Sequence, residues 1–279
     1  MNEGFSLDTF TISVEQFEVV EHILTVGYAA MAAALLFFVL TKNSAMPKYR
    51  PSSVLSVVVM VSAFLLLFTQ QNSWSSAYAF DGTSYTVREN AELFTNGYRY
   101  LNWLIDVPML LIQILFVAGI TGAARSKYMF RFTTSGALMI VTGYIGQFYE
   151  PGRLNENVTA WIVWGLISTG FFIVVLVLIG QVFKEGKANM QGSKALPIFG
   201  AILPLFYVSW WLYPVAYVAP IMMTLGVADY GVTIVSQQLI YTVADISSKV
   251  IYGVMLTATA TILSTEQGYK EDQVVEVSN

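Results

Sequence analysis

Cysteine is absent from the 279-residue sequence, and charged residues make up only 11% of it. Without cysteine the chain has no disulfides and no thiolate metal sites. A soluble domain of this length has roughly a quarter of its residues charged, so the shortage of charge indicates that much of the surface faces lipid. The formal net charge of −4 gives no reason to expect a nucleic-acid partner.

Basic residues are also missing from the start of the chain. Met1 to Glu21 contains neither Lys nor Arg. A secretory leader needs a basic beginning, so no leader is expected. We therefore expect the first apolar stretch to remain in the protein as a membrane span.

Apolar residues are abundant, at 56% of the chain, and the mean hydropathy is +0.61. Seven stretches are long enough to cross about 30 Å of hydrocarbon as helices, which satisfy their own backbone groups. The sequence therefore predicts an all-α bundle of seven membrane helices over residues 19–264. A cap at residues 1–18 precedes it, and a polar tail at 265–279, expected to be disordered, follows it. The expected spans are Val19–Thr41, Ser53–Gln71, Asn96–Thr121, Met129–Phe148, Val158–Phe183, Leu196–Ala219 and Gly231–Ser264.

The loops differ in positive charge. Those on one side, with the tail, hold ten Lys or Arg residues, whereas the opposite loops hold only Arg88 and Arg153. The positive-inside rule then places the N-terminus outside and the C-terminus in the cytoplasm. In the longest outside loop, Asp81 and Gly82 predict a hairpin turn between two short extended segments.

Lys249 and Asp245 lie inside the last span, where a charge costs at least about 2.5–3.5 kcal/mol and needs a partner or a task. Their spacing of four residues puts them on one helix face. One interpretation is a buried ion pair that joins helices. The other is a lysine whose amine forms a Schiff base with a carbonyl cofactor, with carboxylates as counter-charge.

The third span carries a polar stripe on an otherwise apolar helix. Arg99, Asn102, Asp106 and Gln113 fall on one side of it, so this side must face the bundle interior. Asp106 is about as deep as Lys249. The stripe is either a polar clamp between helices or part of the same functional site. Ser62, at mid-depth in the second span, could bond Asp106.

Aromatic side chains inside the spans indicate a cavity, although any one of them is more often packing. Trp103 and Trp210 lie at mid-span with Tyr213. Pro214 can bend the sixth span and open space beside Trp210. Gly143 removes side-chain volume where a bulky ligand could lie.

These residues resemble those of the microbial (type I) rhodopsins, and the resemblance covers all seven spans. The segments that carry it are Asp245–Val250 with Tyr252 and Gly253, Arg99–Asp106, and Trp210 with Tyr213 and Pro214. The match is closest to the bacterial light-driven sodium-pumping rhodopsins, which are marked by an Asn, Asp, Gln triplet on the third helix. Here the triplet is Asn102, Asp106 and Gln113.

The resemblance implies all-trans retinal linked to Lys249, with Asp106 as counterion and proton acceptor and Asp245 as second carboxylate. It implies outward pumping of sodium across a bacterial inner membrane, with protons carried when sodium is scarce, and no enzyme activity. Transferring the imine proton to Asp106 would lift the electrostatic block to sodium. The implied retinal pocket comprises Trp103, Gly143, Trp210, Tyr213, Pro214 and Asp245.

The implied sodium path begins near Ser53 and Thr257 and passes Gln113 and Ser62. The ion would be held briefly by Asn102, Asp106 and Asp245 and would leave past Arg99. The sodium pumps that the chain resembles carry Asn at Ser53, Gly at Thr257 and Arg at Gln237. These departures leave the uptake and exit routes open.

His22 and Glu92 match positions that meet between neighbouring protomers in related pumps, which implies a pentamer with a cation site at the interface. Glu3 and Glu150 match an outer acidic pair of the family.

Two other functions stay open at this stage. One is an outward proton pump, which in the superfamily has an Asp near the position of Asn102 and a carboxylate donor near that of Gln113. The other is a photosensor that signals through a transducer protein. The short polar tail has no room for a signalling domain, so no obligatory transducer is expected.

Overall fold

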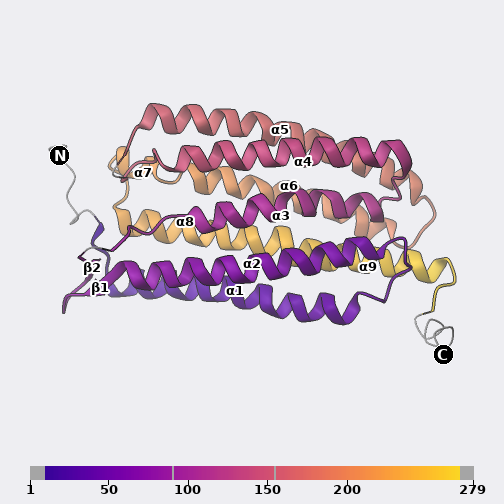
Figure 1. Ribbon diagram of the computed structural model, residues 1–279, viewed down its shortest axis with the longest axis horizontal. Coiled ribbons are helices and arrows are strands. Elements are labelled where there is room, and N and C mark those ends of the chain that lie inside the picture. The colour runs from indigo at the N-terminus through magenta and orange to yellow at the C-terminus, as the bar shows by residue number, and fades with distance from the viewer. Residues whose placement is uncertain (1–9, 90, 154, 271–279) are drawn as a thin grey trace.

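The computed structural model describes residues 10–89, 91–153 and 155–270. Seven long helical rods run side by side, with the β-hairpin at one end and the last turn of α9 at the other (Figure 1). We call these the hairpin end and the C-terminal end. The helices are α1 (Val14–Thr41), α2 (Arg50–Ala77), α3 (Gly97–Val117), α4 (Gly122–Gln147), α5 (Val158–Asn189), α6 (Leu196–Val218), α7 (Ile221–Thr224), α8 (Tyr230–Asp245), η2 (Ile246–Ile251) and α9 (Tyr252–Glu266).

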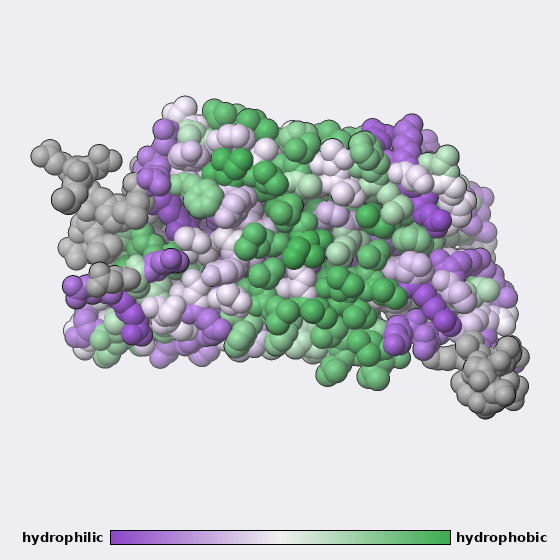
Figure 2. Space-filling model, viewed as in Figure 1, coloured by the Kyte–Doolittle hydropathy of each residue, from purple (hydrophilic) through white to green (hydrophobic). Residues whose placement is uncertain are grey.

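The predicted seven-helix bundle is confirmed, and its outer surface is apolar around the middle. Figure 2 shows a green apolar belt between two more polar ends. Six long helical stretches are apolar enough to cross a membrane by composition alone. The rod that fails this test is α4, because Arg125, Lys127 and Arg131 share it with many small polar residues. Its place in the bundle depends on packing between its neighbours α3 and α5.

The first helix begins at Val14, five residues before the predicted start at Val19, so residues 14–18 of the predicted cap are helical. The cause is a capping box. Ser13 Oγ accepts a hydrogen bond from the Gln16 backbone N–H at 3.2 Å, and Gln16 Oε1 accepts one from the Ser13 N–H at 2.9 Å.

The predicted hairpin is present, with β1 (Tyr78–Phe80) antiparallel to β2 (Tyr85–Val87). Gly82 turns the chain with φ of 106°, which favours glycine. The backbone amides of Thr83 and Ser84 donate to the Asp81 carboxylate and lower its pKa. Ile12 pairs with Tyr85, so the chain before α1 is attached to this hairpin.

The last helical rod, predicted over Gly231–Ser264, runs from Tyr230 to Glu266 and contains a π-helical turn. α8 ends at Asp245, six residues from Ile246 to Ile251 form one wide π-helical turn, and α9 continues to Glu266. Lys249 lies in this turn. Widened turns of this kind often occur at functional sites, and the residue pattern contains no signal that predicts it.

The described part of the predicted tail, residues 265–270, is ordered rather than disordered. The Gln267 amide donates to Tyr49 at 3.0 Å, and Arg50 donates to the Tyr269 hydroxyl at 2.8 Å. Glu266 accepts from Ser193 at 2.6 Å. These contacts join the end of α9 to the α1–α2 and α5–α6 connections. Residues 271–279 lie outside the described residues.

Close packing between α5 and its neighbours gives a testable prediction. A Cβ added at Gly186 would lie 2.6 Å from the Phe199 ring and 2.9 Å from the Ala118 Cβ. Gly186→Ala is therefore expected to lower the free energy of unfolding by roughly 1–3 kcal/mol. A lower thermal midpoint in detergent would confirm this. The matched control is Gly170→Ala on the same helix, where nothing lies within 4 Å, and an equal loss in both variants would contradict the packing explanation.

Candidate functional site

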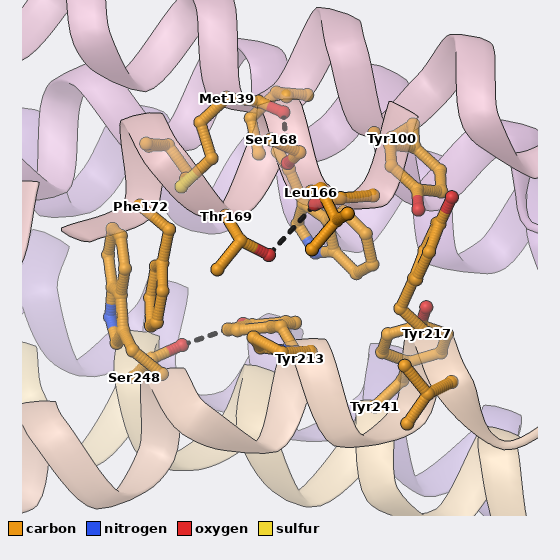
Figure 3. A pocket seen from close by; sticks show the side chains of 18 of the residues that line it. Tyr100, Met139, Leu166, Ser168, Thr169, Phe172, Tyr213, Tyr217, Tyr241 and Ser248 are labelled. Atoms are coloured by element: carbon orange, nitrogen blue, oxygen red, sulfur yellow. Dashed lines mark hydrogen bonds between the residues drawn. The ribbon is translucent and has the colours of Figure 1, made fainter. Parts of the chain in front are cut away.

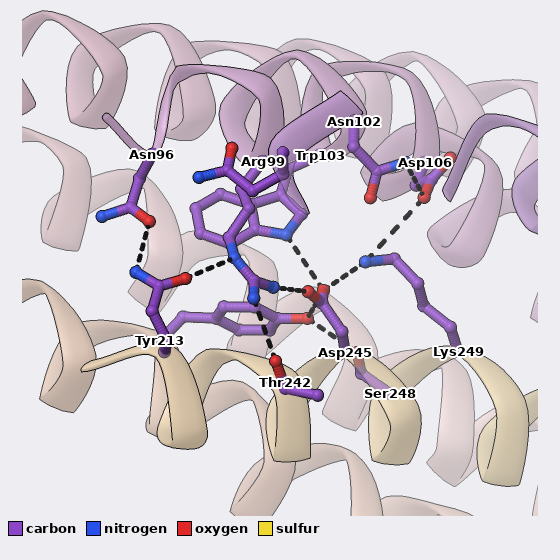
Figure 4. Close-up of polar contacts among 12 residues, drawn as sticks. Asn96, Arg99, Asn102, Trp103, Asp106, Tyr213, Thr242, Asp245, Ser248 and Lys249 are labelled. Atoms are coloured by element: carbon purple, nitrogen blue, oxygen red, sulfur yellow. Dashed lines mark hydrogen bonds and ion pairs between the residues drawn. The ribbon is translucent and has the colours of Figure 1, made fainter. Parts of the chain in front are cut away.

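The intramembrane charges meet where α3 faces the last rod (Figure 4). The Lys249 amine donates to Asp245 Oδ1 and lies 3.9 Å from Asp106 Oδ2. The Arg99 guanidinium donates to Asp245 Oδ2 at 2.6 Å. All four side chains are buried. Two cations and two anions thus share one region, and the balance removes the penalty of an unpaired buried charge.

Asp245 is fully engaged. Besides Lys249 and Arg99, its carboxylate accepts from Trp103 Nε1 at 3.0 Å and from the Tyr213 hydroxyl at 2.9 Å. The Tyr213 and Ser248 hydroxyls also lie 2.9 Å apart. Because four donors already bind this carboxylate, it has little room for a further cation.

Asp106 accepts fewer hydrogen bonds than Asp245. Its Oδ2 accepts from the Asn102 amide at 2.6 Å, and the same amide donates to Ser62 Oγ at 3.1 Å. Asp106 Oδ1 and Asn102 Oδ1 are buried and accept no hydrogen bond from any residue that the structure describes. Two acceptor oxygens without a donor among the described residues therefore belong to the Asn102–Asp106 pair, whose Asp106 carboxylate lies 3.9 Å from the Lys249 amine.

Gln113 lies about two turns further along α3, toward the C-terminal end. Its Oε1 accepts from Ser56 at 2.9 Å. Ser53 on α2 and Thr257 on α9 are also buried. Among the described residues the buried carboxylates are Asp106, Asp245 and Glu150, so the half of the bundle that contains Gln113 has no buried acid.

Toward the hairpin end, a chain of carboxamides begins at Arg99. Arg99 Nε donates to Gln238 at 3.3 Å, Gln238 donates to Asn96 at 2.8 Å, and Asn96 donates to Gln237 at 3.0 Å. The guanidinium also donates to Thr242 at 2.9 Å. The sequence interpretation missed Gln238, Thr242 and Asn96. The intervals from Gln238 through Thr242 and Asp245 to Lys249 are four, three and four residues, and this helical stripe could have revealed the first two.

The remaining predicted residues lie near the hairpin end. Glu150 accepts from Arg153 at 2.7 Å, beside a cavity of about 20 Å³ that Gln237 also lines. His22 and Glu92 are exposed on the single chain, and the pentamer they imply stays a prediction. Glu3 lies outside the described residues.

A larger cavity of about 220 Å³ lies between α3, α4, α5, α6 and the last rod, with Lys249 in its wall. Figure 3 shows Met139, Ser168 and Thr169 on one side and Tyr213 and Ser248 on the other. Apart from Asp245, the predicted pocket residues all line it: Trp103, Gly143, Trp210, Tyr213 and Pro214.

Comparison with known proteins shows the family. Residues 18–263 match the bacteriorhodopsin-like proteins. The chain belongs to this family.

Relatives and solved structures agree with this assignment. The crystal structure of xanthorhodopsin, described as a light-driven ion pump with dual chromophore, has 32% identity and a TM-score of 0.81, covering 93% of this chain and 99% of the other. The blue-light absorbing proteorhodopsin of Gamma-proteobacterium Hot 75m4 is 26% identical over 82% of this chain and 80% of its own. A bacteriorhodopsin-II-like protein of Haloquadratum walsbyi is 25% identical, and the match spans 59% of this chain and 61% of that relative.

Membership of the bacteriorhodopsin-like family implies a retinal chromophore, and the cavity fits one. It is apolar and aromatic, as suits a polyene, and a single buried amine in its wall can condense with one aldehyde. A Cβ at Gly143 would lie 3.2 Å from the Tyr100 ring and 3.3 Å from Ser168 Oγ, so a side chain there would fill the wall. Lys249 would hold the group, and Trp103, Trp210 and Tyr213 would enclose it.

Proposed function

We propose that the protein is a light-driven pump that moves sodium from the C-terminal end to the hairpin end of the bundle. The observation that carries the choice of ion is the chemistry on either side of Asp106. Asn102 and Gln113 are both buried carboxamides. Neither side chain can take up or release a proton at physiological pH. A proton relay along α3 would therefore have no donor or acceptor group at these two positions.

Retinal bound at Lys249 would supply the absorption of light and a transferable proton beside Asp106. Asp106 is suited to take that proton because its Oδ2 lies 3.9 Å from the Lys249 nitrogen and its Oδ1 is unpaired among the described residues. While the positive charge stays on the nitrogen, it repels any second cation in this region of low dielectric. Transfer to Asp106 neutralises both groups and removes the repulsion.

Sodium needs oxygen ligands, as other hard cations do. The unpaired Asn102 Oδ1 lies beside Asp106, and Ser62 adds a hydroxyl. Asp245 was also expected to hold the ion, and it already accepts four donors. We therefore assign the transient site chiefly to Asn102, with Ser62 and the Asp106 carboxyl beside it.

Uptake would run past buried hydroxyls and the Gln113 amide, and release would follow the carboxamides from Gln238 to Gln237. Arg99 closes the release side because its guanidinium is bound to Asp245. The positive-inside pattern of the loops supports a cytoplasmic C-terminal end, and the proposed direction is then outward.

The second candidate is an outward proton pump, and the comparisons favour it more than sodium. The relatives include proteorhodopsins, an archaerhodopsin and xanthorhodopsin, and none of these is named a sodium pump. Asp106 could serve as proton acceptor in either function. The absence of a buried carboxylate between Gln113 and the C-terminal end, among the described residues, speaks against a proton donor there.

Light-driven pH changes in suspensions of cells that make the protein separate the two functions. In NaCl, sodium export would leave the cell interior negative and draw protons inward. We therefore expect alkalinisation of the medium, enhanced by a protonophore. In KCl we expect acidification that the protonophore abolishes. Acidification in NaCl that the protonophore also abolishes would contradict sodium pumping and establish the proton pump.

A further inference from the structure

The retinal cavity reaches the outer surface of the bundle on one side only. Its lining residues from α3, α4, α8 and η2 are all buried. Its exposed lining residues are Ile162 and Leu166 on α5 and Val218 on α6, with exposed fractions of 45%, 66% and 49%. These three residues define what we call the lateral opening, between α5 and α6.

The lateral opening faces hydrocarbon rather than water. Among the described residues, none in a loop at either end of the bundle lines the cavity. Its exposed residues are Ile, Leu and Val, and neighbouring outward residues of the same helices, such as Val163, Ile167 and Val215, are also apolar and exposed. A water-borne ligand would have to cross this apolar surface, whereas a ligand dissolved in the bilayer is already beside it.

On α5, a glycine next to the lateral opening keeps the side-chain volume there small. Gly165 lines the cavity, and a Cβ there would lie 2.8 Å from the Tyr217 ring. Tyr217 in turn donates to the Trp161 carbonyl at 2.9 Å. In Figure 3, Leu166 and Thr169 project into the space between α5 and Tyr213. Leu166 is thus the most exposed side chain that also borders the cavity.

The chemistry of the interior matches a ligand that arrives from the lipid. The rim is apolar, and the reactive amine of Lys249 lies in the buried wall, 1% exposed. A polyene aldehyde partitions into the bilayer because burial of its carbon chain is favourable by about 0.8 kcal/mol for each CH₂ equivalent. Its carbonyl then has to reach the amine across a cavity in which, among the described lining residues, Lys249 is the one Lys, Arg, Asp or Glu.

We infer that retinal is admitted from the bilayer through the lateral opening between α5 and α6, with Leu166 as its principal gate. This inference rests on the proposed function, since it needs retinal as the ligand. It assigns a role in uptake to Ile162, Leu166 and Val218, which line the cavity on its exposed side.

The test measures the rate at which the visible absorption band grows when retinal in donor vesicles is mixed with retinal-free protein in liposomes. Leu166→Trp with Val218→Trp should slow this rate several-fold, and Leu166→Ala should increase it. The final absorption maximum is recorded with the rate, because a changed maximum reports an effect on the bound chromophore and a changed rate reports an effect on uptake. The matched control is Val177→Trp, on the lipid-facing side of α5 and 55% exposed but not part of the cavity lining, which should keep the wild-type rate.

Equal rates in the Leu166 variants, the control and the wild type would overturn the lateral route. If the double Trp variant formed no band through misfolding, the Leu166→Ala rate would still decide the matter. A wild-type protein that formed no band at all would instead contradict the retinal site of the proposed function, so the two failures are distinguishable.

Discussion

Lys249→Ala is expected to leave the protein without a visible absorption band when retinal is supplied. Among the described residues that line the cavity, Lys249 alone carries an amine that can condense with an aldehyde. Retinal without this linkage would absorb as the free aldehyde, in the near ultraviolet. The measurement is the absorption spectrum of purified protein after incubation with all-trans retinal.

The variant needs a control for folding, because removing Lys249 leaves Asp106 and Asp245 with Arg99 as the single buried cation of the group. Loss of one partner of a buried pair costs about 3–5 kcal/mol. Helical circular dichroism and a monodisperse elution peak would establish that the variant is folded. Lys127→Ala, at an exposed position, should keep the full band. A visible band retained by folded Lys249→Ala would remove the Schiff-base assignment.

Asp106→Asn is expected to abolish light-driven transport and to move the absorption maximum to longer wavelength. An amide cannot accept the proton, so the repulsion of sodium by the positive nitrogen would never be lifted. At 4 Å and an effective dielectric constant of about 20, this charge pair is worth about 4 kcal/mol. Its loss destabilises the ground state, in which the positive charge is concentrated on the nitrogen, more than the excited state, where the charge is spread along the polyene.

Transport is measured as the pH change of the medium when cells in NaCl with a protonophore are illuminated. The absorption spectrum is measured on the purified protein. Asp106→Glu is the matched control, because it keeps a carboxylate and should retain part of the transport and a maximum close to that of the wild type. Normal pumping by Asp106→Asn would exclude Asp106 as the proton acceptor. A lost signal with an unshifted maximum would place its role away from the chromophore.

Much of the bundle could be predicted from local pattern. The seven apolar stretches have the length that hydrocarbon requires, and the confirmed hairpin follows from Asp81 and Gly82, which need only their neighbours to turn the chain. The ends of helices were less certain. α1 begins before the predicted start at Val19 because the Ser13 side chain accepts a hydrogen bond from a backbone amide in its first turn. Hydropathy does not measure this effect.

The candidate site was predictable where its residues lie on one helix. Asp245 and Lys249 share a face by their spacing, as do Asn102 and Asp106, and both pairs are bonded in the structure. The seventh helical span was predicted with Lys249 inside it, but the π-helical turn over Ile246–Ile251 that contains Lys249 was not.

Hydropathy and helical spacing were enough to predict which charges lie inside the spans and need partners there, since both depend on residues close together in the chain. The three-dimensional packing was needed to show that Arg99 and Lys249 both bind Asp245, that the carboxamides of Gln238, Asn96 and Gln237 form one chain, and that the cavity opens between α5 and α6. These features depend on how each helix is rotated and shifted against its neighbours. That rotation follows from close packing of side chains far apart in the sequence, for which the pattern of one helix carries no information.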